Sequence, residues 1–272
     1  MEISKEFKLG IFSWFGFVLP LPARLDLIKK AGFDATTLWW EDEIGHPGIP
    51  KEDMPAIVRE SGLNLENIHV PYDNCDDLWS EKRSIRDAVV NRHIIWINDC
   101  AVFGIPMMVM HISDTKAPSI PNKYGIDSIS RILKIAEELN ILIAIENTSR
   151  ADYNQFVLKE LPSQNLGLCY DSSHDWLYNS NQGELLEKSG KRLMAVHLSD
   201  NDGQKDRHWL PGEGNIDWEE VTDIFPYRSY NGNITLEVFP CHQDFNKTPQ
   251  AFLKKGYQRA LWIRSLLDNK VQ

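Results

Sequence analysis

Short segments rich in β-branched and apolar residues alternate along the chain with longer segments whose apolar residues recur at helical spacing. Eight segments have the strand pattern, at residues 8–14, 35–40, 66–72, 107–113, 141–148, 166–172, 193–200 and 233–239. Each precedes a segment with the helical pattern, at residues 22–32, 50–62, 80–104, 125–140, 153–162, 183–190, 217–225 and 248–269. The chain therefore reads as eight consecutive strand-then-helix units.

Eight parallel strands joined by helical crossovers can close into a barrel in which the eighth strand pairs with the first. We therefore predict an α/β fold, a single (β/α)8 TIM barrel that forms one domain over residues 1–272. The alternative is an open doubly wound sheet. No predicted strand is followed by a G-x-G-x-x-G or G-x-x-x-x-G-K-[ST] loop, and this absence favours the barrel.

Composition narrows the classes of function. Hydrophobic residues make up 42% of the chain and charged residues 25%, which is typical of a globular protein with a substantial core. No apolar run is long enough to span a bilayer, and the first residues lack a secretory pattern, so we expect a cytoplasmic protein without a membrane partner. The formal charge of −10 disfavours a nucleic-acid partner without excluding it.

Ionisable side chains stand at the carboxyl ends of six consecutive predicted strands, where a barrel carries its active site. From the third strand to the eighth they are His69, His111, Glu146, Asp171, His197 and Glu237. One such histidine alone would more simply be a hydrogen-bonded core residue. A whole group of buried ionisable side chains costs several kcal/mol per member unless a cation compensates. The pattern therefore predicts a bound divalent metal.

The loop after the seventh predicted strand, HLSDNDGQKDRHWLPGEG, adds further ligand types. Asp206 and His208 form a D-x-H step, and Asp171 and His174 form a D-x-x-H step, so each pair can face neighbouring ions. The candidate metal ligands are then His69, His111, Glu146, Asp171, His174, His197, Asp206, His208 and Glu237. Oxygen and imidazole ligands without cysteine favour zinc or manganese and also suit magnesium, cobalt or iron.

The order H…H…IEN…YDSSH…HLSDND…DRH…PGEGNIDW…LEVF resembles the xylose isomerase-like barrel superfamily over nearly the whole chain. That superfamily includes sugar-phosphate isomerases and epimerases, inosose dehydratases and endonuclease IV. The resemblance implies that Glu146, Asp171, His197 and Glu237 hold one divalent ion, which binds a carbohydrate substrate. It further implies that Glu146 and Glu237 are catalytic and transfer protons; the alternative is that both are only ligands.

The nine-ligand set also resembles the three-metal site of endonuclease IV, which implies a zinc phosphodiesterase acting on abasic DNA. His69 and Tyr72 match the H-x-x-Y of that enzyme. The following segment, residues 73–82, reads DNCDDLWSEK and would repel a DNA backbone. We therefore expect a metal-dependent isomerase or epimerase of a sugar, sugar phosphate or polyol, with the phosphodiesterase and an inosose-type dehydratase as alternatives.

Three residues near the predicted mouth are candidates for substrate binding. Trp14 and Trp176 can form an apolar wall for a sugar ring. Arg207 can bind the substrate or a phosphate, or simply lie on the surface. The glycines of PGEG and the helix-capping Asp217 are expected to be structural, and His46, His93 and His242 are assigned to surface or packing. The broad apolar face of residues 91–104 either covers the barrel or joins subunits of a homo-oligomer.

Overall fold

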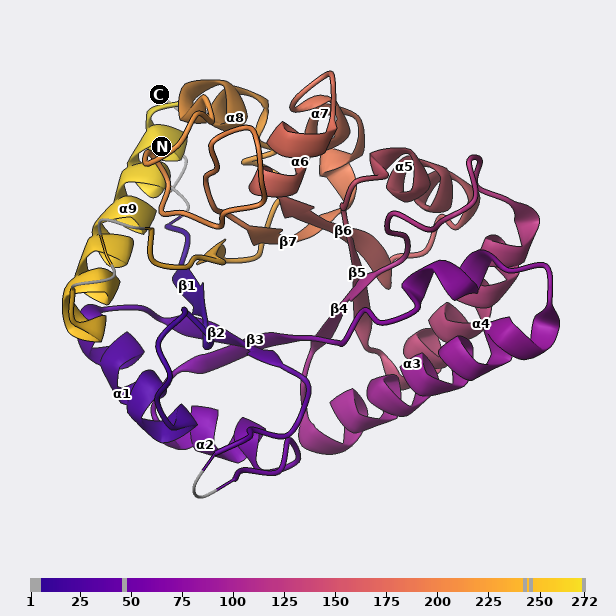
Figure 1. Cartoon of the computed structure of the whole chain (residues 1–272), viewed down its shortest axis with the longest axis horizontal. Coiled ribbons are helices and arrows are strands. Elements are labelled where there is room, and N and C mark those ends of the chain that lie inside the picture. The colour runs from indigo at the N-terminus through magenta and orange to yellow at the C-terminus, as the bar shows by residue number, and fades with distance from the viewer. Residues whose placement is uncertain (1–5, 46–47, 242–243, 245–246, 271–272) are drawn as a thin grey trace.

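The computed structural model describes residues 6–45, 48–241, 244 and 247–270. Eight parallel strands surround its central axis (Figure 1), in the order β7-β6-β5-β4-β3-β2-β1-β8, so strands consecutive in sequence are neighbours in space. The strands are β1 (Leu9–Phe12), β2 (Ala35–Trp39), β3 (Asn64–His69), β4 (Met107–His111), β5 (Leu142–Glu146), β6 (Leu166–Asp171), β7 (Leu193–His197) and β8 (Ile234–Leu236). The predicted single (β/α)8 barrel is confirmed.

The barrel is nearly closed, and its weakest seam lies between β7 and β8. One parallel bridge joins Leu198, the residue after β7, to Leu236, the last residue of β8. The Leu198 N–H donates to the Thr235 carbonyl over 2.9 Å, and the Glu237 N–H donates to the Leu198 carbonyl over 3.3 Å. β8 is shorter than the sequence predicted, because the chain leaves the sheet after Leu236. The Phe239 N–H donates to the carbonyl of His208, in the preceding loop, and not to a strand.

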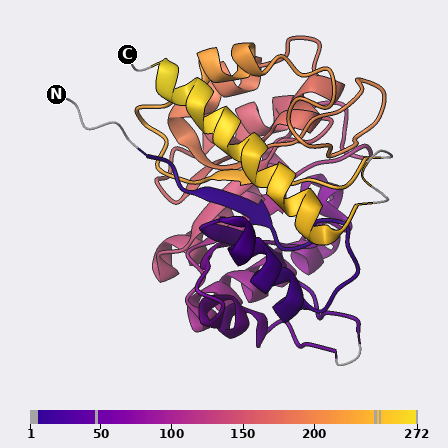
Figure 2. The ribbon, with the colours of Figure 1, turned by 90° about the vertical axis from the view of Figure 1, so that its left-hand side faces the viewer.

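Helices follow every strand and lie outside the ring (Figure 1). They are α1 (Leu21–Ala31), α2 (Met54–Glu60), α3 (Arg83–Phe103), α4 (Lys123–Leu139), α5 (Ala151–Glu160), α6 (Ser172–Tyr178), α7 (Glu184–Ser189), α8 (Trp218–Ile224) and α9 (Pro249–Asn269), with short 3-10 helices at Cys75–Trp79 and Gly190–Arg192. The last helix, α9, packs along β1 and β8, where the first and last units meet (Figure 2). Helix α6 was not predicted from the sequence, and it begins directly at the end of β6.

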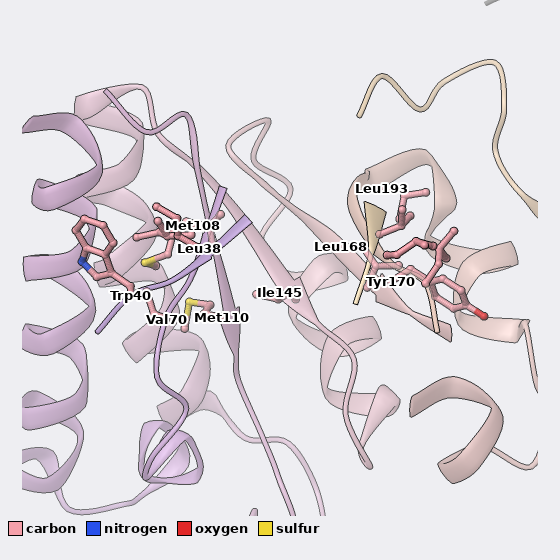
Figure 3. Close-up of a cluster of buried hydrophobic side chains, with 14 of the residues drawn as sticks. Leu38, Trp40, Val70, Met108, Met110, Ile145, Leu168, Tyr170 and Leu193 are labelled. Carbon is pink, nitrogen blue, oxygen red and sulfur yellow. The ribbon is translucent and has the colours of Figure 1, made fainter. Parts of the chain in front are cut away.

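The two faces of the strands have different neighbours because side chains alternate between them. Outward-facing side chains such as Leu38, Met108 and Ile145 are buried in the layer between strands and helices (Figure 3). A separate cluster fills the barrel interior and consists of Met107, Val109, Ala144, Cys169 and Ala195. The next inward positions on these strands are His111, Glu146, Asp171 and His197. Period-two alternation therefore aims the predicted ligands into the barrel mouth.

The long helix α3 covers the barrel with one face and exposes the other. His93 is buried within it beside Trp96, as expected for a packing histidine, whereas His46 and His242 lie outside the described residues. Ile95 and Val102 are exposed on α3, and self-association through this helix stays a prediction. Within the described part of the chain, no helix is both long and apolar enough to cross a membrane.

Candidate active site and metal centre

A cavity of about 490 Å³ opens at the carboxyl ends of the strands. Its floor carries ionisable side chains that the sequence singled out, namely His69, His111, Glu146, His174, Asp206, His208 and Glu237. Its wall includes aromatic and charged side chains from α1, the end of β2 and the loops after β1, β2 and β3, namely Trp14, Arg24, Trp39, Glu41, Asp42, Glu43 and Tyr72. The cavity therefore combines a ligand-rich floor with a wall that can contact a small molecule.

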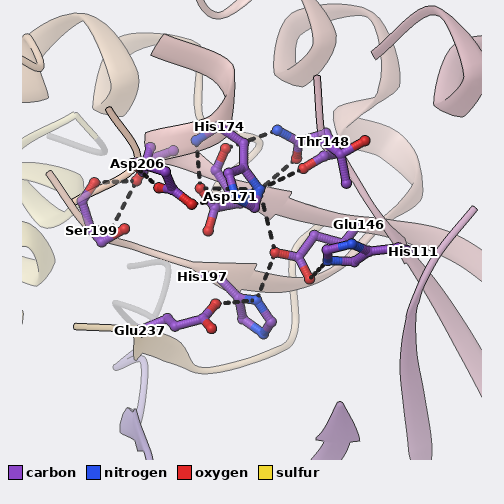
Figure 4. A network of polar contacts seen from close by, with 12 residues as sticks. His111, Glu146, Thr148, Asp171, His174, His197, Ser199, Asp206 and Glu237 are labelled. Atoms are coloured by element: carbon purple, nitrogen blue, oxygen red, sulfur yellow. Dashed lines mark hydrogen bonds and ion pairs between the residues drawn. The ribbon is translucent and has the colours of Figure 1, made fainter. Parts of the chain in front are cut away.

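Glu146, at the end of β5, is the central carboxylate of the floor (Figure 4). Its Oε2 lies 2.8 Å from His69 Nε2 and 3.4 Å from His111 Nε2. Its Oε1 lies 3.2 Å from His197 Nδ1. Burial alone would raise the pKa of Glu146, but His197 and the other two histidines hold it well below its ordinary value. Glu146 is therefore an anion in contact with imidazole groups from three strands.

The ring of His197 lies between two carboxylates (Figure 4). Its Nδ1 is 2.9 Å from Glu237 Oε2, in addition to the contact with Glu146. Burial favours neutral Glu237, yet His197 lowers its pKa to about 2. One ligand atom each from Glu146, Asp171, His197 and Glu237 lies within 4.8 Å of the others. The four residues predicted to share one ion are therefore adjacent.

Asp171 both ends β6 and begins α6. Its Oδ1 accepts the backbone N–H of His174 over 2.7 Å, which caps the helix and explains the D-x-x-H spacing. Its Oδ2 is buried without a hydrogen-bond partner. A buried carboxylate oxygen without a partner is costly, so this atom fits a cation ligand.

The D-x-H step lies beside this group. Asp206 Oδ2 is 3.0 Å from His174 Nε2 and 2.9 Å from His208 Nε2, so it bridges the two rings. Its Oδ1 accepts the Ser173 hydroxyl over 2.8 Å. Ligand atoms of Asp171, His174 and His208 form a further group that could hold a metal, as do those of His69, His111 and Glu146.

Backbone carbonyls decide which nitrogen of three histidines is protonated. Nδ1 lies 3.0 Å from the Val70 carbonyl in His69, 2.8 Å from the Asn147 carbonyl in His174, and 3.1 Å from the Glu237 carbonyl in His208. Since a carbonyl only accepts, each Nδ1 carries the proton. Each Nε2 faces a carboxylate. Burial disfavours a charged ring, but Asp171 and Asp206 hold the pKa of His174 well above its ordinary value, and Asp206 and Glu237 raise the pKa of His208 to about 9. A divalent cation can take the place of the Nε2 proton between nitrogen and oxygen, and this donor set fits such a metal.

Asp200 organises the loop that carries Asp206 and His208. Its Oδ2 accepts the Gly212 N–H over 2.8 Å and the Trp218 indole N–H over 3.0 Å. A side chain at position 214 would bring its Cβ within 2.0 Å of the Asn201 carbonyl oxygen, so glycine is required there. Asp217 accepts the N–H groups of Glu219 and Glu220 over 3.1 Å, and the predicted cap of α8 is confirmed.

The three candidate substrate-binding residues have different surroundings. Trp14 lines the cavity and is 38% exposed. Trp176 lies on α6 outside the cavity lining and is half-buried, because it packs against the hydrophobic core. Arg207 is also outside the lining: its guanidinium pairs with Asp202 over 2.9 Å, since Asp202 holds the adjoining turn. The geometry of the described residues therefore gives only Trp14 a position at the cavity.

Arg24 is a residue of the site that was not predicted from the sequence. It occupies the buried face of α1 together with Leu21, Leu25 and Ile28, and it lines the cavity. An arginine at a position that helical periodicity assigns to the apolar face was the available signal. Tyr72, noted only for its motif, stacks on His111 with ring centroids 4.6 Å apart.

Comparison with known proteins agrees with this architecture. The family model described as xylose isomerase-like TIM barrel matches residues 25–261. An uncharacterised protein of Methanocaldococcus jannaschii is 32% identical over 258 residues, covering 85% of this chain and 84% of that protein. A probable endonuclease 4 of Natranaerobius thermophilus is 25% identical, with 83% and 90% covered. An inosose isomerase of Bacillus velezensis is 26% identical, with 80% and 83% covered.

Solved structures share the fold. The structure of an L-ribulose 3-epimerase aligns with a TM-score of 0.79 at 14% identity, covering 97% of each chain. A D-psicose 3-epimerase solved in the presence of D-fructose aligns with a TM-score of 0.73 at 17% identity, covering 96% of this chain and 99% of that one. The matched residues span most of the barrel, and this chain belongs to the xylose isomerase-like TIM barrel family.

Proposed function

We propose that this protein is a metal-dependent isomerase or epimerase of a small carbohydrate or related polyol. The observation that carries the proposal is the pair of carboxylates Glu146 and Glu237, which flank the same ring nitrogen of His197 at 3.2 and 2.9 Å. The inosose isomerase among the relatives and the sugar epimerases among the solved structures support this class of reaction.

A divalent metal held by Glu146, Asp171, His197 and Glu237 would supply Lewis acidity towards a substrate carbonyl and its neighbouring hydroxyl. Zinc and manganese are the ions that this donor set favours. The donor atoms fit such an ion because carboxylate oxygens and one imidazole nitrogen converge within 4.8 Å.

Proton transfer is the task of the two glutamates. Both have pKa values below their ordinary range, because histidines outweigh the effect of burial, so each is ionised at neutral pH and can accept a proton. They come from β5 and from the end of β8 and reach His197 from different sides (Figure 4). Epimerisation needs one group to remove a proton from carbon and another to return it on the opposite face. Dehydration of a cyclic polyol would begin with the same proton removal.

The test is exchange of carbon-bound hydrogen with D₂O, followed by NMR on a panel of ketohexoses and inososes with the metal-loaded protein. We expect Glu146→Gln and Glu237→Gln each to lower the exchange rate by at least about a hundredfold, the usual contribution of general acid–base catalysis. Glu60→Gln, which alters an exposed carboxylate on α2, is the matched control. If both glutamine variants exchange at the native rate on a substrate that the native protein turns over, the proposal is wrong.

A second candidate function is metal-dependent hydrolysis of a phosphodiester. Two additional groups of candidate ligands favour it. One consists of His69, His111 and Glu146, and the other consists of Asp171, His174 and His208. The similarity to a probable endonuclease 4 also supports it. Against a DNA substrate stand the acidic wall residues Glu41 and Asp42 and the net charge of −10.

The two candidate functions predict different numbers of metal ions per chain and different substrates. Elemental analysis that finds about one ion favours the isomerase, whereas two or three favour two-metal or three-metal hydrolysis. Cleavage of a duplex with one abasic site, abolished by a chelator and by His69→Ala or His208→Ala, would establish the hydrolase instead.

A further inference from the structure

Arg24 places a permanent positive charge in the cavity wall. Among the described residues, it is the one lysine or arginine that lines the cavity. The residue is 1% exposed, and its guanidinium lies 5.1 Å from the ring centroid of Trp14. Its Nε has no hydrogen-bond partner. Such a group is a natural anchor for a phosphate, since guanidinium binds phosphate oxygens through paired hydrogen bonds.

The carboxylate of Glu43 is already paired with this guanidinium. The Arg24 Nη2 donates to Glu43 Oε1, and the two side chains form an ion pair. Glu43 belongs to the loop between β2 and α2, and its backbone pairs with Ile49 through hydrogen bonds of 2.8 and 3.2 Å. The loop backbone at Glu43 is therefore held by its own hydrogen bonds, and its side chain pairs with Arg24.

The same wall carries two further acidic residues. Glu41 and Asp42 line the cavity next to Glu43. A phosphate at the wall would meet three carboxylates and a guanidinium whose charge is already compensated, whereas an uncharged hydroxyl group would meet ordinary hydrogen-bonding partners. The wall thus opposes anionic substituents although it contains an arginine.

We propose that Glu43 is a specificity-determining residue, which masks Arg24 and so makes the cavity select unphosphorylated carbohydrates over their phosphorylated forms. This inference rests on the proposed function, because it names the class of carbohydrate that the same site accepts. Removal of the Glu43 charge should turn Arg24 into a phosphate anchor.

The test measures binding of inorganic phosphate to the metal-loaded protein by calorimetric titration at fixed ionic strength. We expect Glu43→Gln to bind phosphate about tenfold more tightly than the native protein, or better, the gain expected from a charge-assisted hydrogen bond. The double variant Arg24→Met with Glu43→Gln should lose this gain. The matched control Glu60→Gln, which removes an equal charge from an exposed position, should bind phosphate as the native protein does.

Unchanged phosphate affinity in Glu43→Gln overturns the inference, and so does a gain that persists in the double variant, since the gain would then not depend on Arg24. If Glu43→Gln does not fold, Glu43→Asp withdraws the carboxylate by one methylene and should show a smaller gain in the same direction.

The outcome is distinguishable from that of the proposed function. Carbohydrate turnover without the phosphate gain overturns only the masking of Arg24. A phosphate gain without any carbohydrate turnover supports the masking and contradicts the isomerase proposal.

Discussion

Asp171 divides two tasks between its two carboxylate oxygens. One oxygen accepts the N–H of His174 and caps α6, and the other is buried and lacks a partner. A serine hydroxyl can take over the first task, because it also caps helices, but it cannot replace a carboxylate as a metal ligand. The two tasks can therefore be separated by substitution.

We expect Asp171→Ser and Asp171→Ala to lose metal binding equally, and the serine variant to be about 1 kcal/mol more stable than the alanine variant without metal. Urea unfolding of chelator-treated protein and elemental analysis measure the two effects. Equal stability of the two variants would argue against the cap, and full metal content in either would argue against the ligand.

For other residues of the site, the residue type alone does not reveal which groups they contact. His69, His174 and His208 each have one nitrogen held by a backbone carbonyl, and no sequence pattern states which carbonyl lies there. Arg24 stands among leucines and isoleucine on α1, so its charge was visible in sequence but its partner Glu43 was not.

At the scale of elements, α3 contains a histidine that is kept neutral by its burial. His93 is 1% exposed, and its Nδ1–H donates to the Val89 carbonyl one turn earlier over 2.8 Å. Burial lowers the pKa of His93 from 6.5 to about 4. The folded chain therefore binds this proton less readily than the unfolded chain does.

This pKa shift predicts a loss of stability in acid. The contribution of His93 to the free energy of unfolding is fully present above pH 6.5. It falls as the pH drops towards about 4, by about 3 kcal/mol in total. We expect His93→Gln, which does not titrate, to unfold in urea with a smaller dependence of its free energy on pH across this window. An identical pH dependence in the native protein and the variant would contradict the prediction.

Most elements followed from local patterns, and two of the departures have a visible tertiary cause. The YDSSH segment contains the start of α6, which a short polar run does not predict, because the helix is capped by the candidate ligand Asp171. β8 ends at Leu236 since Phe239 pairs with His208, a residue of the preceding loop.

At the scale of the whole molecule, the candidate metal centre spans the weakest seam of the barrel. β7 and β8 are joined by one bridge, between Leu198, just after β7, and Leu236, the last residue of β8; His197 and Glu237 are the neighbours of these two residues in sequence. An ion shared by these residues would join the two strands and bind the folded chain only. Metal binding should therefore stabilise the complete barrel.

We expect free zinc or manganese at a thousand times its dissociation constant to stabilise the native protein by about 4 kcal/mol. Thermal unfolding with and without metal measures this effect. Glu237→Gln should lose most of it, whereas Glu60→Gln should keep it. A native protein whose melting temperature is the same in metal and in chelator would refute the prediction.

Sequence patterns were enough to predict the (β/α)8 order, the inward direction of the strand-end candidate ligands and the cap at Asp217. These features depend on local periodicity and on neighbours a few residues apart, which the chain carries wherever it folds. Only the tertiary structure decided which ligands share a group, that Arg24 pairs with Glu43, and that Trp176 and Arg207 lie away from the cavity. Such choices depend on distances between residues far apart in sequence, which exist only after the strands have closed around a common axis.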